Sequence, residues 1–259
     1  HQQSLLICLQ KNKKGKKKEK YYQRTFRHSE TKEIRLYGLK GKDEFHISGE
    51  VDKGIKIRIV GGPQKDEIKD KSEVKGWTGK IRVYDDDKYI YRYNAFNYRK
   101  SVPLAFVGYN ADDFIVLGAG LMMTSHGFQK FPYATHHQAV ARYASATNAL
   151  EFIYDGIFTS AFMGLDFQLH LDIRDPRYTQ NYFGLGNETE QGSDDKDFNR
   201  VRIGHLGIHP ELSKTINNNT FSAGLFYQQY NVEETPERFI SDIPVNGLDP
   251  EIFENQDYT

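Results

Sequence analysis

Two pairs of histidines are the side chains of this chain whose type and spacing could bind a metal ion. His205 and His209 are four residues apart, which on a helix would place both rings on one face. The surrounding pattern instead predicts a strand, where they would share a face but lie roughly 13 Å apart. His136 and His137 are adjacent and are interpreted as a loop or interfacial feature. Metal binding is therefore not expected at either pair.

No set of residues has a spacing typical of catalysis. The chain lacks a Gly-x-Ser-x-Gly elbow and a phosphate-binding glycine loop, and no Ser, His and Asp set lies in a strand-turn-helix context. Cys8 is the only cysteine, so neither an internal disulfide nor a cysteine-based zinc site can form. We therefore expect that this chain is not an enzyme.

Two turns that combine glycines with acidic residues lie 23 residues apart, one running from Gly38 to Phe45 and the other from Gly61 to Ile68. They resemble the Gly-Gly-x-Gly-x-Asp turns of parallel β-rolls, in which backbone and Asp oxygens bind calcium. The resemblance implies Asp43 and Asp66 as calcium ligands. A lysine beside each Asp weakens such a site, so plain β-turns in two related coils are the alternative.

The elements that carry these turns are short strands separated by Gly, Asp and Lys clusters. The predicted strands are Glu33–Tyr37, Glu44–Ser48, Ile55–Val60, Lys80–Tyr84 and Tyr89–Tyr93. The lysine run from Lys11 to Lys20 is interpreted as a solvated loop or hairpin tip. Residues 1–94 are therefore predicted to form a basic β-domain, either a short solenoid or a sheet.

Charge is unevenly distributed although the net charge is zero. Residues 1–100 contain 26 Lys and Arg against 14 Asp and Glu, whereas residues 101–259 contain 9 against 21. This asymmetry indicates that the two parts have different surroundings. The basic residues mostly alternate with apolar ones, as on solvated strand faces, so a nucleic-acid partner is not expected.

Residues 95–259 are predicted to form long strands, of which the clearest runs from Met163 to Arg174. Apolar residues alternate there with polar or small ones, so one face of the strand is apolar. At ~3.3 Å per residue and a tilt of ~45°, this strand would cross roughly 28 Å, about the apolar thickness of an outer membrane. The side chains expected to face lipid are Met163, Leu165, Phe167, Leu169, Leu171 and Ile173.

Five further segments bring the predicted long strands to about six. They are Phe114–Thr124, His137–Thr147, Ala149–Phe158, Phe198–His209 and Thr220–Val232. Asn148 and residues 217–219 predict tight turns because Asn tolerates the left-handed conformation. By contrast, residues 178–197 and the C-terminal residues 233–259 are long, polar and acidic. Short turns at one rim and long loops at the other are typical of membrane barrels.

The most specific motif lies between Arg174 and Thr189. It closely resembles an element of the BamA/TamA-like surface-antigen barrels, and the matching residues are Asn181, Tyr182, Phe183, Gly184, Leu185, Gly186, Asn187 and Glu188. Residues 107–114 are similar to the segment that opens such barrels. Residues 31–39 are similar to the β-domain before the barrel in the Bacteroidetes-type version of the family. The resemblance covers roughly residues 22–235.

The resemblance implies an all-β protein in which a small periplasmic β-domain precedes the first strands of an antiparallel transmembrane barrel. The implied location is the bacterial outer membrane, and the implied partners are its lipid and other outer-membrane proteins or complex subunits. The implied function is insertion or translocation of outer-membrane proteins, through a weak seam that pairs with an incoming strand. Residues expected in the first strand at this seam are Phe114, Val116, Gly118 and Gly120, where the glycines would weaken packing.

Other functions remain open. Such barrels have about sixteen strands, so a chain with six is expected to be a fragment, or to be completed by other strands. One alternative is a passive barrel, such as an anchor for the calcineurin-like metallophosphoesterase that often lies upstream in this family. Another is a soluble β-rich binding or adhesion protein. No cofactor is expected apart from calcium at the two glycine turns.

Overall fold

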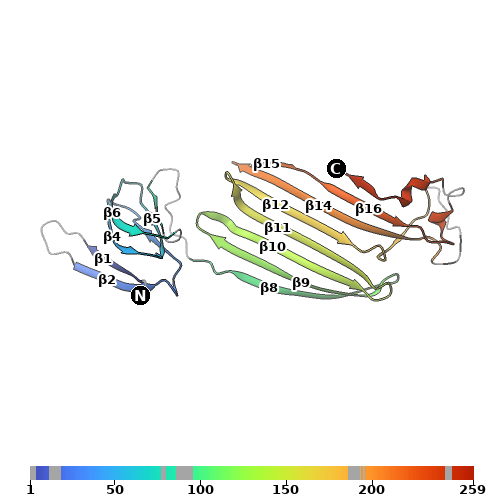
Figure 1. Cartoon of the computed structure of the whole chain (residues 1–259), viewed down its shortest axis with the longest axis horizontal. Coiled ribbons are helices and arrows are strands. Elements are labelled where there is room, and N and C mark those ends of the chain that lie inside the picture. The colour runs from blue at the N-terminus through green and yellow to red at the C-terminus, as the bar shows by residue number, and fades with distance from the viewer. Residues whose placement is uncertain are drawn as a thin grey trace. The chain divides into compact units, whose positions relative to one another are not determined.

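The computed structural model describes residues 4–11, 19–76, 80–85, 96–185, 193, 195, 197–242 and 247–259. The described residues form strands and two short 3-10 helices, η1 (Phe239–Ser241) and η2 (Pro250–Phe253), so the predicted all-β class is confirmed. No helix among these residues is long and apolar enough to cross a membrane. The chain divides into two compact units, His1–Phe96 and Asn97–Thr259, which are described separately (Figure 1).

The first unit begins with two antiparallel strands, β1 (Ser4–Lys11) and β2 (Glu19–Arg27). They flank the lysine-rich segment that we interpreted as a hairpin tip. Residues 12–18 of that segment lie outside the described residues. The pairing of the two strands agrees with the interpretation as a hairpin.

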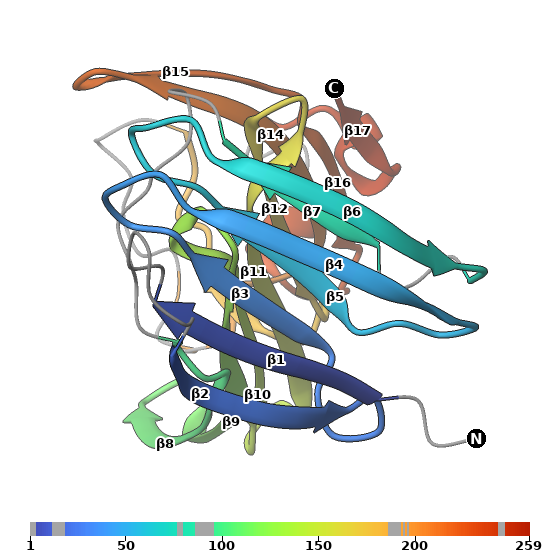
Figure 2. The same ribbon diagram turned by 90° about the vertical axis from the view of Figure 1, so that its left-hand side faces the viewer.

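Short parallel strands form the rest of the first unit (Figure 2). They are β3 (Glu33–Tyr37), β4 (Glu44–Val51), β5 (Lys56–Val60), β6 (Glu67–Val74) and β7 (Ile81–Tyr84). β3, β5 and β7 form one parallel sheet, and β4 pairs with β6 in a second. Glu33 pairs with Lys56 and Glu44 with Glu67, a step of 23 residues in each sheet, and Ile57 pairs with Ile81, a step of 24. This arrangement is a short solenoid, one of the two predicted alternatives.

The core of this solenoid is aliphatic and lies on β5. Ile55, Ile57, Ile59 and Val60 are all buried, and Ile59 and Val60 have no exposed surface. β6 was not predicted, because its sequence alternates charged residues with few large apolar ones. The predicted strand Tyr89–Tyr93 lies outside the described residues.

The second unit is built on one antiparallel sheet (Figure 1). In order across the sheet its strands are β17 (Gln256–Tyr258), β16 (Tyr227–Glu233), β14 (Arg200–Ile216), β12 (Leu165–Arg174), β11 (Ala149–Phe162), β10 (Lys130–Ala144), β9 (Phe114–Gly127) and β8 (Lys100–Asn110). Two short strands, β13 (Thr179–Asn181) and β15 (Asn219–Gly224), also pair with β14. Strands β8 to β12 and β14 have 10 to 17 residues, whereas strands of soluble proteins average about 5–6.

The predicted first strand of this sheet needs correction. Phe114–Thr124 falls in β9, which pairs with β8 on one side and β10 on the other, so β8 is the edge strand. β8 was not predicted because apolar residues lie on both of its faces, with Val102 and Leu104 on one face and Ala105 on the other. Its sequence therefore lacks the alternation of apolar and polar residues that predicts a strand. Pro103 also argued against a strand, although an edge strand tolerates Pro because one side of its backbone needs no partner.

Two further predictions for this sheet are wrong because the chain turns or breaks where a strand was expected. Met163 lies in the turn between β11 and β12, with φ 51° and a fully exposed side chain, so it does not belong to the apolar face of β12. The predicted strand Thr220–Val232 is broken at residues 225–226 into β15 and β16. The turn residues Asn148 and Asn217 do adopt the predicted left-handed conformation, with φ of 54° and 55°.

Candidate functional site

The two faces of the long sheet differ in chemistry, and together they are the candidate functional site. We call one the apolar face, which contains Leu165, Phe167, Leu169, Leu171 and Ile173 of β12. In the register of the sheet, Phe167 lies opposite Phe158 of β11 and Leu212 of β14. The apolar character continues across the strands, and the exposed side chains on this face include Leu117, Leu121, Phe152, Ile173 and Leu212.

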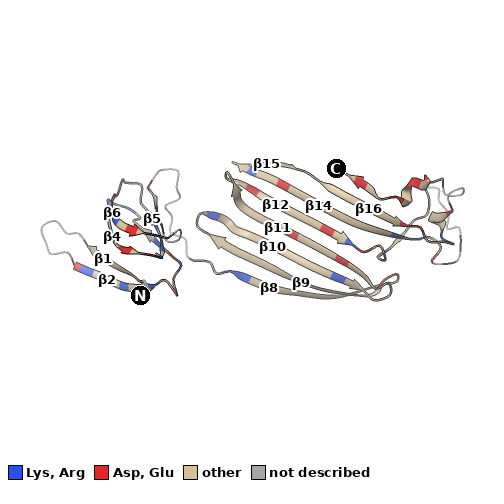
Figure 3. Cartoon of the chain, in the orientation of Figure 1, with Lys and Arg blue, Asp and Glu red and all other residues tan. Residues whose placement is uncertain are grey.

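The opposite face, which we call the charged face, buries more of its side chains. The buried hydrophobic residues of the sheet all lie on it: Val140, Ala144, Ala149, Val201 and Val232. Figure 3 shows that charged residues are sparse along the long strands. The difference in burial indicates that side chains of the charged face converge, whereas those of the apolar face spread apart.

Glu151 is the most buried acidic residue of the charged face. Its side chain is 4% exposed and lies between two arginines on the neighbouring strands. Arg142 of β10 donates to its Oε2 at 2.8 Å, and Arg174 of β12 contacts its Oε1 at 3.2 Å. The three residues are direct cross-strand partners, so the register of β10, β11 and β12 sets this contact. Arg142 also lies over the ring of Phe106 in β8, 5.6 Å from its centroid.

Histidines extend this polar network along β12 and β14. Asp172 contacts Arg174 at 3.9 Å and Nδ1 of His205 at 3.4 Å. His170 lies 2.7 Å from Asp155, and its ring centroid is 5.8 Å from that of His209. His205 and His209 therefore share a strand face as predicted. No group of three His, Cys, Asp or Glu side chains suited to a metal ion occurs among the described residues.

The adjacent histidines His136 and His137 lie in β10, so the loop alternative of our interpretation is wrong and the interfacial one stays a prediction. They point to opposite faces of the sheet, because successive side chains of a strand alternate. His136 contacts Oγ1 of Thr124 at 3.0 Å, and His137 contacts the hydroxyl of Tyr154 at 2.8 Å. Both contacts join β10 to a neighbouring strand.

The glycines predicted to weaken a seam lie inside the sheet instead. A Cβ atom at Gly118 would collide with the ring of Phe106, and one at Gly120 would meet the carbonyl oxygen of Ala139. The absence of a side chain at Gly118 therefore makes room for an aromatic ring from the edge strand. Val116 is paired on both sides, with Gly108 of β8 and Ala144 of β10, and Phe114 pairs with Asn110 of β8. None of the four predicted residues lies on the sheet edge.

The motif residues lie where β12 returns to β14. Asn181 pairs with Arg200, and the backbone N–H of Tyr182 donates to Asn199 at 2.8 Å. The Tyr182 ring stacks on Phe239 with centroids 5.8 Å apart. Phe183 and Leu185 are exposed, and Gly184 has φ 109°. Gly186, Asn187 and Glu188 lie outside the described residues.

Tyr182 takes part in a small hydrophobic cluster at this end of the sheet. Its buried members are Val201, Val232 and Ile240. Side chains from η2 also pack against it, so the long C-terminal connection folds onto the ends of β14 and β16. The sequence indicated an acidic loop here, and its few apolar residues were too widely spaced to predict that it packs.

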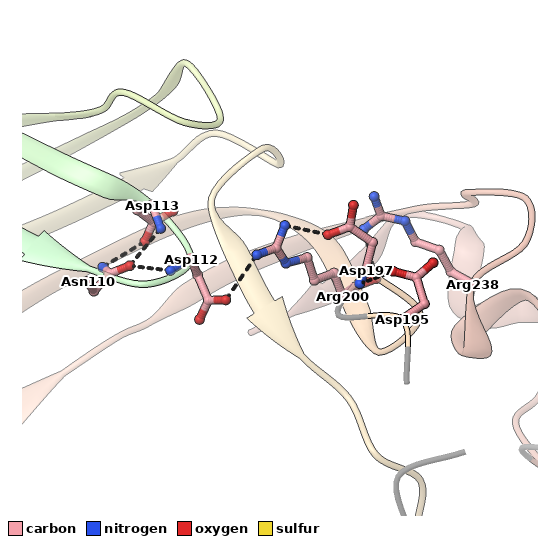
Figure 4. Close-up of polar contacts among 7 residues, drawn as sticks. All are labelled: Asn110, Asp112, Asp113, Asp195, Asp197, Arg200 and Arg238. Atoms are coloured by element: carbon pink, nitrogen blue, oxygen red, sulfur yellow. Dashed lines mark hydrogen bonds and ion pairs between the residues drawn. The ribbon is translucent and has the colours of Figure 1, made fainter. Parts of the chain in front are cut away.

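Arg200 links distant strands at the same end of the sheet (Figure 4). It contacts Asp112, in the turn between β8 and β9, at 3.1 Å, and Asp197 at 2.5 Å. Three strands separate β9 from β14, and at ~4.8 Å per strand a flat sheet would place them about 19 Å apart. The sheet must therefore curve at this end. Arg238 adds a hydrogen bond of 3.1 Å to the Arg200 carbonyl oxygen.

In the first unit, the calcium candidates Asp43 and Asp66 occupy equivalent positions in successive coils. The backbone N–H of Asp43 donates to Oδ1 of Asp66 at 2.8 Å. Asp66 is buried, at 8% exposure. Burial raises the pKa of Asp43, and the neighbouring charge of Asp66 raises it further. The two predicted turns thus meet at one corner of the solenoid.

Glu33 is the main acidic contact of the other solenoid sheet. Arg35 donates to it at 2.8 Å, and Arg58 of the next coil contacts it at 2.9 Å. Burial acts to raise the pKa of Glu33, but the hydrogen bonds and charges of the two arginines outweigh it and lower the pKa. This contact joins β3 to β5.

Comparisons of the chain with models of known protein families, with curated proteins and with solved structures find no match. The resemblance to surface-antigen barrels therefore stays a prediction from the motifs.

Proposed function

We propose that the second unit is part of an outer-membrane β-barrel of the surface-antigen type. In this proposal the apolar face contacts lipid and the charged face lines the interior. The observation that carries the proposal is the apolar face itself, which extends over strands of 10 to 17 residues and leaves the aliphatic side chains of Leu117, Leu121, Leu150, Ile173 and Leu212 exposed. A transmembrane strand needs about 9–11 residues, so β8 to β12 and β14 are long enough.

The distribution of buried residues supports this proposal. A soluble sheet packs its apolar face against a second layer, whereas here the buried hydrophobic residues of the sheet lie on the charged face. An aliphatic surface of this extent favours aggregation when it is exposed to water. Contact with lipid would remove this exposure. The curvature that brings Asp112 to Arg200 is also in keeping with a sheet that rolls into a barrel.

Closing the barrel requires more strands than this sheet contains. β8 and β17 are the edges of the described sheet, and an open edge is not stable in the hydrocarbon region. We infer that further strands, from this protein or from a partner, complete the barrel. The first unit would then lie in the periplasm.

A role in inserting other outer-membrane proteins would use the edge strand β8. Its outer backbone groups have no partner strand in the described sheet, so they offer hydrogen bonds to an incoming strand. The passive barrel, including an anchor for an upstream phosphoesterase, would keep this edge permanently paired. The soluble alternative would instead cover the apolar face with protein.

The proposal is tested by adding the unfolded chain, together with the strands that complete the barrel, to phospholipid vesicles and, separately, to buffer without detergent. We expect folding and protease protection of the second unit only with vesicles. A chain that is monomeric, folded and fully soluble in buffer would contradict the membrane proposal and favour the soluble binding protein.

Assembly activity is tested separately by disulfide trapping. Single cysteines in β8 should crosslink to a cysteine in the terminal strand of an outer-membrane protein during its insertion, whereas matched cysteines in β11, inside the sheet, should not. Absence of crosslinks to β8 in a membrane-inserted chain would favour the passive barrel.

A further inference from the structure

One corner of the solenoid holds a line of three aspartates, one from each coil. Asp43 lies just before β4, Asp66 just before β6, and Asp85 just after β7. The N–H of Asp43 donates to Oδ1 of Asp66 at 2.8 Å, and the N–H of Asp66 donates to Oδ2 of Asp85 at 3.3 Å. The backbone amides of Asp43 and Asp66 thus orient the carboxylates of Asp66 and Asp85, respectively.

The second oxygens of the first two carboxylates face one small space. Oδ2 of Asp43 and Oδ2 of Asp66 are buried, and neither accepts a hydrogen bond in the described structure. A Cβ atom at Gly38 would lie 2.9 Å from the first oxygen and 3.2 Å from the second. Both oxygens therefore border the same point, which stays open because residue 38 has no side chain. Gly61 and Asp85 repeat this arrangement one coil further along.

Neither carboxylate that borders this space forms an ion pair in the described part of the chain, although Lys42 and Lys65 lie next to them in the sequence. A buried carboxylate oxygen without a partner is unfavourable, and two facing carboxylates also repel each other. Asp66 is more than nine-tenths buried, so water cannot screen this repulsion well.

We propose that the space between Asp43 and Asp66, beside Gly38, binds a divalent cation that prefers oxygen ligands, such as Ca²⁺ or Mg²⁺. The two unpartnered oxygens supply negative charge from successive coils, so the ion joins the coils to each other. Sites with one or two carboxylates complete their coordination with water, as Mg²⁺ sites commonly do. This matches the finding that no group of three acidic or His side chains surrounds one point in the described residues. The site is independent of the membrane role proposed above.

The proposal is tested by calorimetric titration of the folded, chelator-treated full chain with CaCl₂ and, separately, MgCl₂. Wild-type chain should bind at least one of the two ions, and NaCl at equal ionic strength should give no binding heat. Asp43→Asn keeps the shape of the side chain but removes one charged ligand, so affinity should fall at least about tenfold. Asp52→Asn, at an exposed turn position of the same unit, is the matched control and should bind like wild type.

Hydrogen exchange provides a second measurement that needs no variant. The bound ion should slow amide exchange in peptides covering residues 38–45 and 61–68, but not in β1 or β2. Failure of both ions to bind or to slow exchange at millimolar concentration would overturn the proposal. Equal affinity of Asp43→Asn and wild type would overturn it as well.

Discussion

At the scale of single residues, Glu151 shows how the charged face is held together. Its carboxylate is almost fully buried and contacts Arg142 and Arg174, so one acid is shared by two cations on adjacent strands. By contrast, the ion pair of Arg202 with Glu233 has side chains that are 45% and 40% exposed, so it contributes little. The register of β10, β11 and β12 should therefore depend strongly on Glu151.

Replacing this carboxylate should destabilise the second unit far more than replacing an exposed one. Glu151→Gln leaves two arginines without their shared partner, and we expect a loss of about 3 kcal/mol in the free energy of unfolding. The matched control Glu233→Gln should lose at most about 1 kcal/mol. Urea unfolding followed by circular dichroism measures both. Equal losses for the two variants would mean that Glu151 does not hold the strands together.

In the first unit, the lowered pKa of Glu33 predicts how the stability of the solenoid depends on pH. Its folded pKa lies below the ordinary value of 4.5, so the folded state binds the proton less readily than the unfolded chain does. Its contribution to stability is complete above pH 4.5 and is lost as the pH falls through the lowered folded value. Protection of β3 and β5 amides from hydrogen exchange should therefore decrease on acidification through this range.

The Glu33→Gln variant should show weaker protection at neutral pH and a smaller further loss on acidification. Glu30→Gln is the matched control, because Glu30 is exposed and forms only a surface pair with Arg27. An acid-induced loss that is identical in wild type and Glu33→Gln would show that another group causes it.

At the scale of elements, the alternation of residues predicted most long strands, because each has one face more apolar than the other. The same rule missed β8, where apolar residues occupy both faces. It also misplaced Met163, because a left-handed turn residue next to a strand can continue the apolar pattern by chance. The role of Gly118 in leaving room for the ring of Phe106 could not be predicted, because Phe106 lies on β8 and the sequence did not predict that strand.

The chemistry of the apolar face predicts the effect of a charge in the middle of β12. In a membrane, Leu169→Arg should destabilise the folded chain by about 2–4 kcal/mol, because the arginine would lie among lipid tails. Gln168→Arg, one position away on the charged face, is the matched control and should cost much less. Folding yield in vesicles at increasing urea concentration measures both. An unaffected Leu169→Arg variant would argue that this face contacts water.

At the scale of the whole molecule, a basic solenoid precedes a long antiparallel sheet in an acidic region of the chain. The solenoid repeat was visible in the sequence as the 23-residue spacing of two glycine turns. The packing of Tyr182 against Val201 and Val232 could not be predicted from the sequence, because it depends on contacts between segments about 20 to 50 residues apart. The short motif therefore predicted a family, but not the hydrophobic cluster that its tyrosine helps to form.

The central claim, that the apolar face of the long sheet contacts lipid, is tested most directly by a spin-label scan of β12. Cys8 is the only cysteine, so a Cys8→Ser background allows single labels at each position from Leu165 to Arg174 in vesicles. If the apolar face contacts lipid, accessibility should alternate with a period of two, with odd positions accessible to oxygen in the bilayer and even positions accessible to a water-soluble nickel reagent. Equal access of the nickel reagent to both sets would contradict the claim.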